Sequence, residues 1–258
     1  MSYAHILVER EERLTIVTIN RPQAYNALNP AAQLELQDAF DRFAEDDDQW
    51  VAILTGAGPK AFCGGMDLKA QADNPDLFTP EKGFGGFTAR FDLAKPVIGA
   101  VNGAALGGGF ELALACDILV ASENATFALP EPRVGLAALA GGIQRLPREI
   151  GLKRAMGMML TGRRVTAREA EALGFVNEVV SGDLLDAARR WAGEILACSP
   201  MAVRATKEAV LRGLSVPVAE GLVQQWEYPA MKQMLASADA VEGPSAFAEK
   251  RAPVWRGR

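Results

Sequence analysis

The alternation of apolar and polar positions predicts a mixed α/β chain whose last third is helical. Short apolar runs predict strands at 6–8, 14–19, 51–55, 95–101, 118–121, 126–128 and 175–180, with the first two paired around a charged turn at 10–13. Helical patterns cover 31–44, 144–160, 166–173, 184–198, 199–211, 218–235 and 237–250. Because strands give way to helices, we divide the chain into a core over residues 1–197 and a helical region over residues 198–258.

A glycine-rich segment follows the predicted strand at 95–101. Asn102-Gly103 predicts a turn, and Gly107, Gly108 and Gly109 open a helix that carries Glu111 about one turn in. Free N–H groups at such a helix start, together with the helix dipole, favour an oxygen that carries negative charge. On the residues alone, the alternative is that Glu111 is an acid that only stabilises this helix end.

A second acid, Glu131, lies between two prolines in Leu129-Pro-Glu-Pro-Arg133. The prolines discourage a helix, so we expect Glu131 on a stiff extended turn, where a plain surface residue is the alternative interpretation. An anion-stabilising backbone segment with two carboxylates nearby suggests chemistry that forms and protonates an enolate.

Composition and charge exclude several other classes of protein. The 258-residue chain has a net charge of -5, which argues against general nucleic-acid binding. No apolar run approaches the roughly 18 residues of a membrane span, and the N-terminus does not resemble a signal peptide. Three widely separated cysteines argue against a disulfide framework or a zinc site, so we expect a cytoplasmic protein. The single histidine, His5, lies outside any motif, so carboxylates should carry the proton transfers.

Five ordered motifs resemble the crotonase (enoyl-CoA hydratase/isomerase) family. They are Asn20-Arg-Pro-Gln-Ala-Tyr-Asn-Ala-Leu28, Ala61-Phe-Cys-Gly-Gly-Met-Asp-Leu68, Ala100-Val-Asn-Gly-Ala-Ala-Leu-Gly-Gly-Gly-Phe-Glu-Leu-Ala-Leu-Ala-Cys-Asp117, Leu160-Thr-Gly-Arg163 and Phe247-Ala-Glu-Lys-Arg251. The resemblance implies a spiral core of repeated ββα turns and a C-terminal helical region that drives trimerisation, with a trimer or a dimer of trimers as the assembly.

The resemblance also implies roles for single residues. The backbone N–H groups of Met66 and Gly108 would form an oxyanion hole, while Glu111 activates water and Glu131 protonates the α-carbon. The coenzyme A portion of the substrate would contact Ala24, Gly64, Asp67, Leu68, Phe247 and Lys250, the last two reaching from a neighbouring subunit. Without the resemblance, Ala24 would lie in an ordinary turn, Asp67 would cap a tight turn, and Lys250 would be a surface charge. No metal and no separate cofactor are expected, since coenzyme A arrives as part of the substrate.

Hydration of an enoyl-CoA thioester is therefore the predicted activity, with an acyl-CoA thioester and further copies of the chain as the expected partners. Double-bond isomerisation on the same scaffold is an alternative, and a non-catalytic acyl-CoA-binding protein is disfavoured by the two acids. Leu139 stands where a short-chain hydratase of this family has glycine, which puts ordinary crotonyl substrates in question. The tail at 240–258 resembles carnitinyl-CoA (crotonobetainyl-CoA) hydratases. Residues 70–90, which contain Phe78, Phe84 and Phe87, would either border the acyl pocket or form a loose surface loop.

Overall fold

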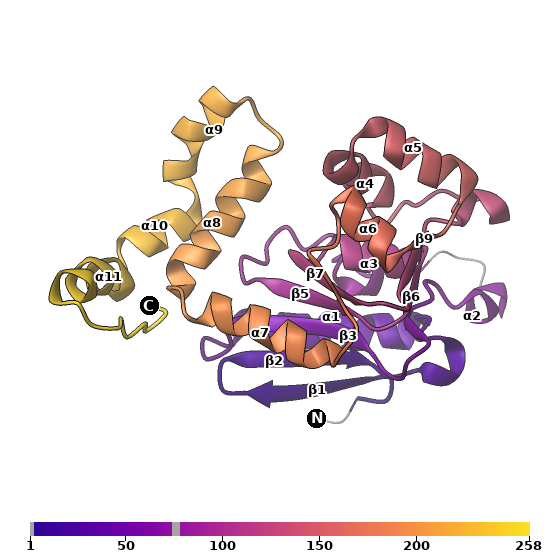
Figure 1. Cartoon of the computed structure of the whole chain (residues 1–258), viewed down its shortest axis with the longest axis horizontal. Coiled ribbons are helices and arrows are strands. Elements are labelled where there is room, and N and C mark those ends of the chain that lie inside the picture. Colours follow the sequence, from indigo (N-terminus) through magenta and orange to yellow (C-terminus); the bar gives the residue numbers. More distant parts are fainter. Residues whose placement is uncertain (1–2, 74–77) are drawn as a thin grey trace.

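A six-stranded sheet forms the base of the molecule (Figure 1). The computed structural model describes residues 3–73 and 78–258. Along the sheet the strands are ordered β1 (Ile6–Glu11), β2 (Leu14–Ile19), β3 (Val51–Gly56), β5 (Val97–Val101), β7 (Ile118–Ser122) and β10 (Glu178–Val180). Strands β1 and β2 are antiparallel, as their charged turn predicts, and every later pair in this sheet is parallel.

A second, smaller sheet contains β4 (Ala61–Cys63), β6 (Ala104–Leu106), β8 (Thr126–Ala128) and β9 (Val165–Thr166). Along the chain, β3, β5 and β7 of the first sheet are each followed by a strand of the second sheet and then by helical structure. The first two such helices are α2 (Leu68–Asp73) and α3 (Gly108–Leu114). This repeated strand–strand–helix order is the predicted spiral, and it places three strand ends in one row.

The central strands are buried on both faces, which explains their continuous apolar runs. In β3, Val51 and Ile53 pack with the face covered by α7 (Leu184–Leu196), whereas Ala52 and Leu54 join the larger core on the other side. That larger core also takes in the apolar face of α1 (Pro30–Glu45). The period-2 alternation of the strands thus fixes which helices cover which face.

The remaining helices lie on two sides of the sheets (Figure 1). On one side are α4 (Gly142–Ile150), α5 (Leu152–Thr161) and α6 (Ala167–Leu173); on the other are α8 (Pro200–Gly213), α9 (Val218–Gln224), α10 (Pro229–Leu235) and α11 (Ala238–Glu249). Short 3₁₀ helices are η1 (Pro22–Ala24), η2 (Phe84–Gly86), η3 (Glu131–Val134) and η4 (Gln225–Glu227).

Side-chain caps begin several of these helices where the sequence predicts them. The side chain of Asn29 accepts a hydrogen bond from the Ala32 N–H at 2.9 Å, and that of Thr166 accepts one from the Glu169 N–H at 3.2 Å. Ser199 and Ser237 cap α8 and α11 in the same way. Each cap satisfies a backbone donor that the first helical turn leaves free.

The differences from the predicted elements include a helix that is broken and a short strand that was not expected. The single helix expected over 218–235 is wrong: α9 ends at Gln224, η4 follows, and α10 begins at Pro229. Pro229 has no N–H and its ring crowds the preceding turn, so it is favoured at a helix start and disfavoured in a helix interior. Strand β6 was not expected, because its three residues lie between a predicted turn and the glycine run.

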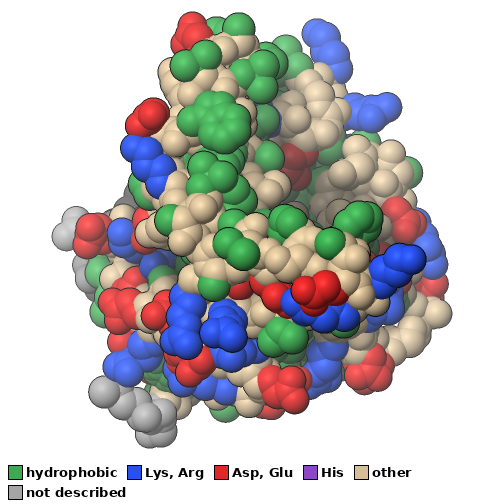
Figure 2. Space-filling model, turned by 90° about the vertical axis from the view of Figure 1, so that its left-hand side faces the viewer, with side chains coloured by type: hydrophobic (Ala, Val, Ile, Leu, Met, Phe, Trp, Pro, Cys, Tyr) green, Lys and Arg blue, Asp and Glu red, His purple; other side chains and the backbone are tan. Residues whose placement is uncertain are grey.

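Hydrophobic side chains gather on the face formed by the C-terminal helices (Figure 2). Exposed apolar residues on these helices include Val210, Leu211, Leu214, Val218, Leu222, Val223, Trp226 and Phe247. Among the described residues, none of the helices is both long enough and apolar enough to cross a bilayer.

Candidate active site

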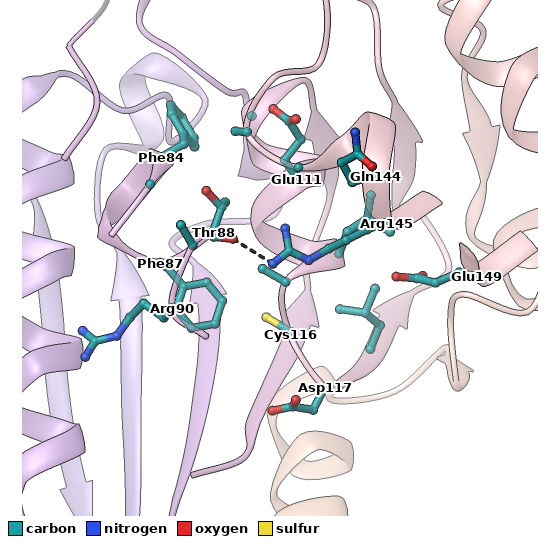
Figure 3. A pocket seen from close by; sticks show the side chains of 18 of the residues that line it. Phe84, Phe87, Thr88, Arg90, Glu111, Cys116, Asp117, Gln144, Arg145 and Glu149 are labelled. Carbon is teal, nitrogen blue, oxygen red and sulfur yellow. Dashed lines mark hydrogen bonds between the residues drawn. The ribbon is translucent and has the colours of Figure 1, made fainter. Parts of the chain in front are cut away.

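A cavity of about 1600 Å³ opens between the strand ends, α4 and α8. Its wall brings together the predicted residues Gly64, Met66, Leu68, Gly108, Glu111 and Glu131. The close-up in Figure 3 shows polar and aromatic side chains from several elements facing this space. Residues more than 60 positions apart in the sequence therefore share one cavity.

The start of α3 depends on glycine at two positions. Gly107 has a φ of +55°, a conformation that side chains disfavour. A Cβ atom on Gly109 would lie 1.9 Å from the carbonyl oxygen of Cys63, so the helix rests directly on the backbone of β4. This contact brings the N-terminus of α3 beside the turn that follows β4, where Met66 lies.

Two backbone N–H groups face the cavity without a protein acceptor. Within the described part of the chain, neither Met66 nor Gly108 donates its backbone N–H to another protein group. The two turns touch: a Cβ atom built on Gly65 would lie 3.3 Å from the Gly108 nitrogen. Two free donors at one helix N-terminus form a place where a carbonyl oxygen can be held as it gains negative charge.

Glu111 is buried in the wall of the cavity, with 3% of its surface exposed. Its Oε1 accepts a hydrogen bond from the Gly142 N–H at 2.8 Å, which links α3 to the start of α4. The pKa of Glu111 is raised to about 7, chiefly by burial and in part by the nearby charge of Glu131, against the opposing effect of the Gly142 N–H. The carboxyl can therefore exchange a proton near neutral pH.

Glu131 is the first residue of η3, so the extended turn expected for it is wrong. Pro132 is accommodated because a first-turn residue needs no N–H partner. One carboxyl oxygen, Oε2, is buried without a hydrogen-bond partner among the described residues. A Cβ atom built on Gly107 would lie 3.1 Å from the other oxygen. Burial raises the pKa of Glu131.

The far end of the cavity carries a charged group from α4 that the sequence analysis missed. Arg145 donates a hydrogen bond to the carbonyl oxygen of Thr88 at 2.7 Å (Figure 3). Its guanidinium also lies over the ring of Phe91. Glu149, one turn further along α4, points into the same space and makes no hydrogen bond or ion pair with the described residues. Burial raises the pKa of Glu149 to about 7. Their spacing of four residues predicts that Arg145 and Glu149 share one face of a helix. It does not predict that this face borders the cavity.

Aromatic and aliphatic side chains complete the wall. Phe84 and Phe87 line the cavity, so this part of 70–90 borders it as one interpretation predicted, while residues 74–77 lie outside the described residues. Leu139 also lines the cavity, with 72% of its surface exposed.

Four of the residues expected to contact coenzyme A do not line this cavity. Ala24 ends η1, and the carboxylate of Asp67 pairs with Arg21 at 3.0 Å. Phe247 is 87% exposed on α11, and Lys250 follows the end of that helix. Their contacts with coenzyme A stay predictions. In residues 3–73 and 78–258, no three acidic, histidine or cysteine side chains are grouped as metal ligands.

Comparison with known proteins identifies the scaffold. A family model described as enoyl-CoA hydratase/isomerase matches residues 9–258. The chain belongs to this family. The carnitinyl-CoA dehydratase of Salmonella typhi is 46% identical over 94% of each chain, and that of Proteus mirabilis is 44% identical over the full length of both.

Solved structures of the enoyl-CoA hydratase/isomerase family confirm the predicted fold. An enoyl-CoA hydratase from Mycobacterium tuberculosis H37Rv superposes with a TM-score of 0.92 at 43% identity, over 98% of this chain and 99% of the other. An enoyl-CoA hydratase from Bacillus anthracis gives a TM-score of 0.89 at 38% identity, over 99% of this chain and all of the other.

Proposed function

We propose that the protein is a hydro-lyase that adds water across the 2,3 double bond of an enoyl-CoA thioester. The observation that carries the proposal is the meeting of two acids, the buried Glu111 and the half-buried Glu131, with two free backbone N–H groups in one cavity. Family membership and the enoyl-CoA hydratases among the structural neighbours support the same reaction.

In the proposed mechanism, the thioester carbonyl oxygen accepts hydrogen bonds from the N–H groups of Met66 and Gly108. These donors gain most when the oxygen takes on enolate charge, and losing one such donor typically costs a factor of about 10²–10³ in rate. Glu111 removes a proton from water as the water oxygen bonds to C3, and Glu131 delivers a proton to C2. The product is a 3-hydroxyacyl thioester, and at the end of the step Glu111 is protonated and Glu131 is ionised.

The test is loss of the conjugated enoyl absorbance of crotonyl-CoA, measured with the wild type, Glu111→Gln and Glu131→Gln. We expect a fast loss in the wild type and a fall by orders of magnitude in both variants. A product with a shifted double bond and no added water would support the isomerase instead. Tight binding of the thioester without any turnover would support a non-catalytic binding protein.

A second candidate substrate is an acyl group with a cationic end. The carnitinyl-CoA dehydratases among the relatives act on a carnitine-derived acyl group, and carnitine carries a quaternary ammonium ion. Glu149 favours this candidate, because it is an unpaired carboxyl at the far end of the cavity. The Arg145 charge acts on Glu149 and opposes the effect of burial on its pKa, but the two side chains form no ion pair, and the guanidinium donates to the Thr88 carbonyl instead. Nearby phenylalanine rings, including Phe87, offer faces that attract a quaternary ammonium.

We also propose that the protein works as a homo-oligomer, a trimer or a dimer of trimers. The apolar face of the C-terminal helices supports this proposal, because exposed patches of this kind commonly mark interfaces. Light scattering of the purified protein would measure the assembly, and a monomer at micromolar concentration would contradict it.

A further inference from the structure

The segment from Arg21 to Leu28 pairs with the turn that carries Met66. The Gly64 N–H donates to the Tyr25 carbonyl at 2.9 Å, and the Leu28 N–H donates to the Gly65 carbonyl at 2.8 Å. The Asp67 N–H then donates to the Leu28 carbonyl at 3.0 Å. This parallel pairing uses the groups on both sides of Met66 and skips Met66 itself. The register of one short bridge is therefore what leaves the Met66 N–H free for a ligand.

Arg21 ties the two partners of this bridge together from behind. Its Nη2 donates to Oδ2 of Asp67 at 3.0 Å, and its Nη1 donates to the carbonyl oxygen of Ala27. Both side chains of the ion pair are largely buried, with 12% of Arg21 and 17% of Asp67 exposed. Burial alone would raise the pKa of Asp67, but the hydrogen bonds from Arg21 and from the Ala70 N–H outweigh it and lower that pKa. The carboxylate next to Met66 is therefore held in its charged form.

Asn26 fixes the same segment to the strands beneath it. Its side chain is fully buried, accepts a hydrogen bond from the Arg21 N–H at 2.9 Å and donates to the carbonyls of Ala57 and Ala61. Asn26 and Tyr25 both have a positive φ, at 55° and 53°, which asparagine tolerates better than most residues. Asn26 thus holds the Arg21 backbone in place, and the Arg21 guanidinium in turn holds the carboxylate of Asp67.

We propose that Arg21 is a positioning residue for the oxyanion hole, acting through Asp67 on the Met66 N–H. Arg21 does not line the cavity that holds the two acids. Catalytic donors must stay within about 0.5 Å of their productive positions to stabilise the transition state. The Met66 turn touches the Gly108 turn, so any relaxation of the ion pair changes the gap between the two donors. The inference rests on the proposed hydratase function, because it assigns a residue to that same site.

The experiment compares Arg21→Gln, Arg21→Lys and Asp67→Asn in hydration of crotonyl-CoA. We expect Arg21→Gln to lower kcat by about 10–100-fold, with KM changed less than about threefold, because the lost interaction acts in the transition state. Arg21→Lys keeps an ion pair with Asp67 and should recover most of the rate. The double variant Arg21→Gln/Asp67→Asn should be no slower than the slower of its two single variants, because both substitutions break the same ion pair. Arg10→Gln breaks a surface ion pair of equal length, 3.0 Å, to Asp46 and should leave kcat unchanged.

A second measurement reads the oxyanion hole without turnover. Acetoacetyl-CoA forms an absorbing enolate when its thioester oxygen is held by donors, so the enolate fraction at saturation reports the hole itself. We expect that fraction to fall in Arg21→Gln and Asp67→Asn and to recover in Arg21→Lys. If Arg21→Gln does not fold, Asp67→Asn breaks the same ion pair and serves as the test.

Three results would overturn the inference: wild-type kcat and enolate fraction in Arg21→Gln, a loss explained by the unfolded fraction alone, or multiplicative losses in the double variant. Failure of the proposed function looks different. In that case the wild type hydrates no enoyl-CoA, while the enolate measurement with its Arg21 variants still decides whether the ion pair positions the donors.

Discussion

Replacing Glu111 by glutamine should stabilise the folded protein at alkaline pH while it abolishes activity. The carboxyl is almost fully buried, and burial raises its pKa from the ordinary 4.5 to about 7. Each pKa unit is worth about 1.4 kcal/mol, so ionised Glu111 costs the folded state about 3 kcal/mol at pH 8. Glutamine removes that charge and keeps an oxygen that can accept the Gly142 N–H hydrogen bond.

The sign of the effect follows from where each state loses its proton. Below pH 4.5 the carboxyl is protonated in both states, so the wild type is not penalised. Between pH 4.5 and about 7 the unfolded chain ionises first, so the stability of the wild type falls as pH rises. Above pH 7 both states are ionised and the penalty stays constant. The advantage of Glu111→Gln should therefore grow over this window and then level off.

Urea unfolding at pH 5 and pH 8, followed by tryptophan fluorescence at one protein concentration, measures this difference. We expect the variant to exceed the wild type by about 2–3 kcal/mol at pH 8 and by less than about 1 kcal/mol at pH 5. Glu9→Gln, at an exposed position on β1, changes the net charge equally and should show no such trend. A Glu111→Gln protein that is less stable than the wild type at pH 8 would refute the reasoning.

Three further predictions concern activity and packing. The kcat/KM for crotonyl-CoA should rise with pH as the Glu111–Glu131 pair loses its first proton and fall as the pair loses its second, because hydration needs one acid ionised and the other protonated; a flat profile from pH 5 to 9 would contradict carboxylate catalysis. Gly109→Ala should destabilise the fold by at least about 1–3 kcal/mol and lower kcat, because its Cβ would lie 1.9 Å from the Cys63 carbonyl oxygen; unchanged thermal unfolding would contradict that contact. Glu149→Gln should slow crotonobetainyl-CoA hydration about 10-fold or more but leave its neutral isostere, 5,5-dimethylhex-2-enoyl-CoA, unchanged; equal losses on both would contradict a cation site.

Local signals were enough to predict much of the fold. Asn29, Thr166, Ser199 and Ser237 start their helices as expected, because a cap depends only on a few neighbouring residues. The glycine run at 107–109 likewise indicated the helix start, whereas the contact of Gly109 with the backbone of Cys63 is known only from the structure. Pro229 is also a local signal for the break between α9 and α10, but the amphipathic pattern continues on both sides of it and predicts one long helix.

The site depends on contacts that no local pattern contains. Spacing along the chain could not show that Glu111 and Glu131 meet, so the resemblance to a family supplied that expectation, and the shared cavity now supports it. Arg145 and Glu149 were missed because the direction in which α4 faces is set by its packing on α3 and α5. The role of Arg21 was also hidden, since its partner lies 46 positions away.

The order of the strands along the chain has a consequence for folding. The N–H donors come from the turns after β4 and β6, and the second acid comes only after β8. A chain wound through two turns of the spiral would hold both donors but not Glu131, so it could bind a thioester oxygen without completing hydration. The full site exists only when the third turn is in place. Because the cavity is also lined by residues of η3, α4 and α8, which follow the second turn, a bound acyl-CoA stabilises the fully wound state most, by about 2.7 kcal/mol at a ligand concentration of 100 times Kd.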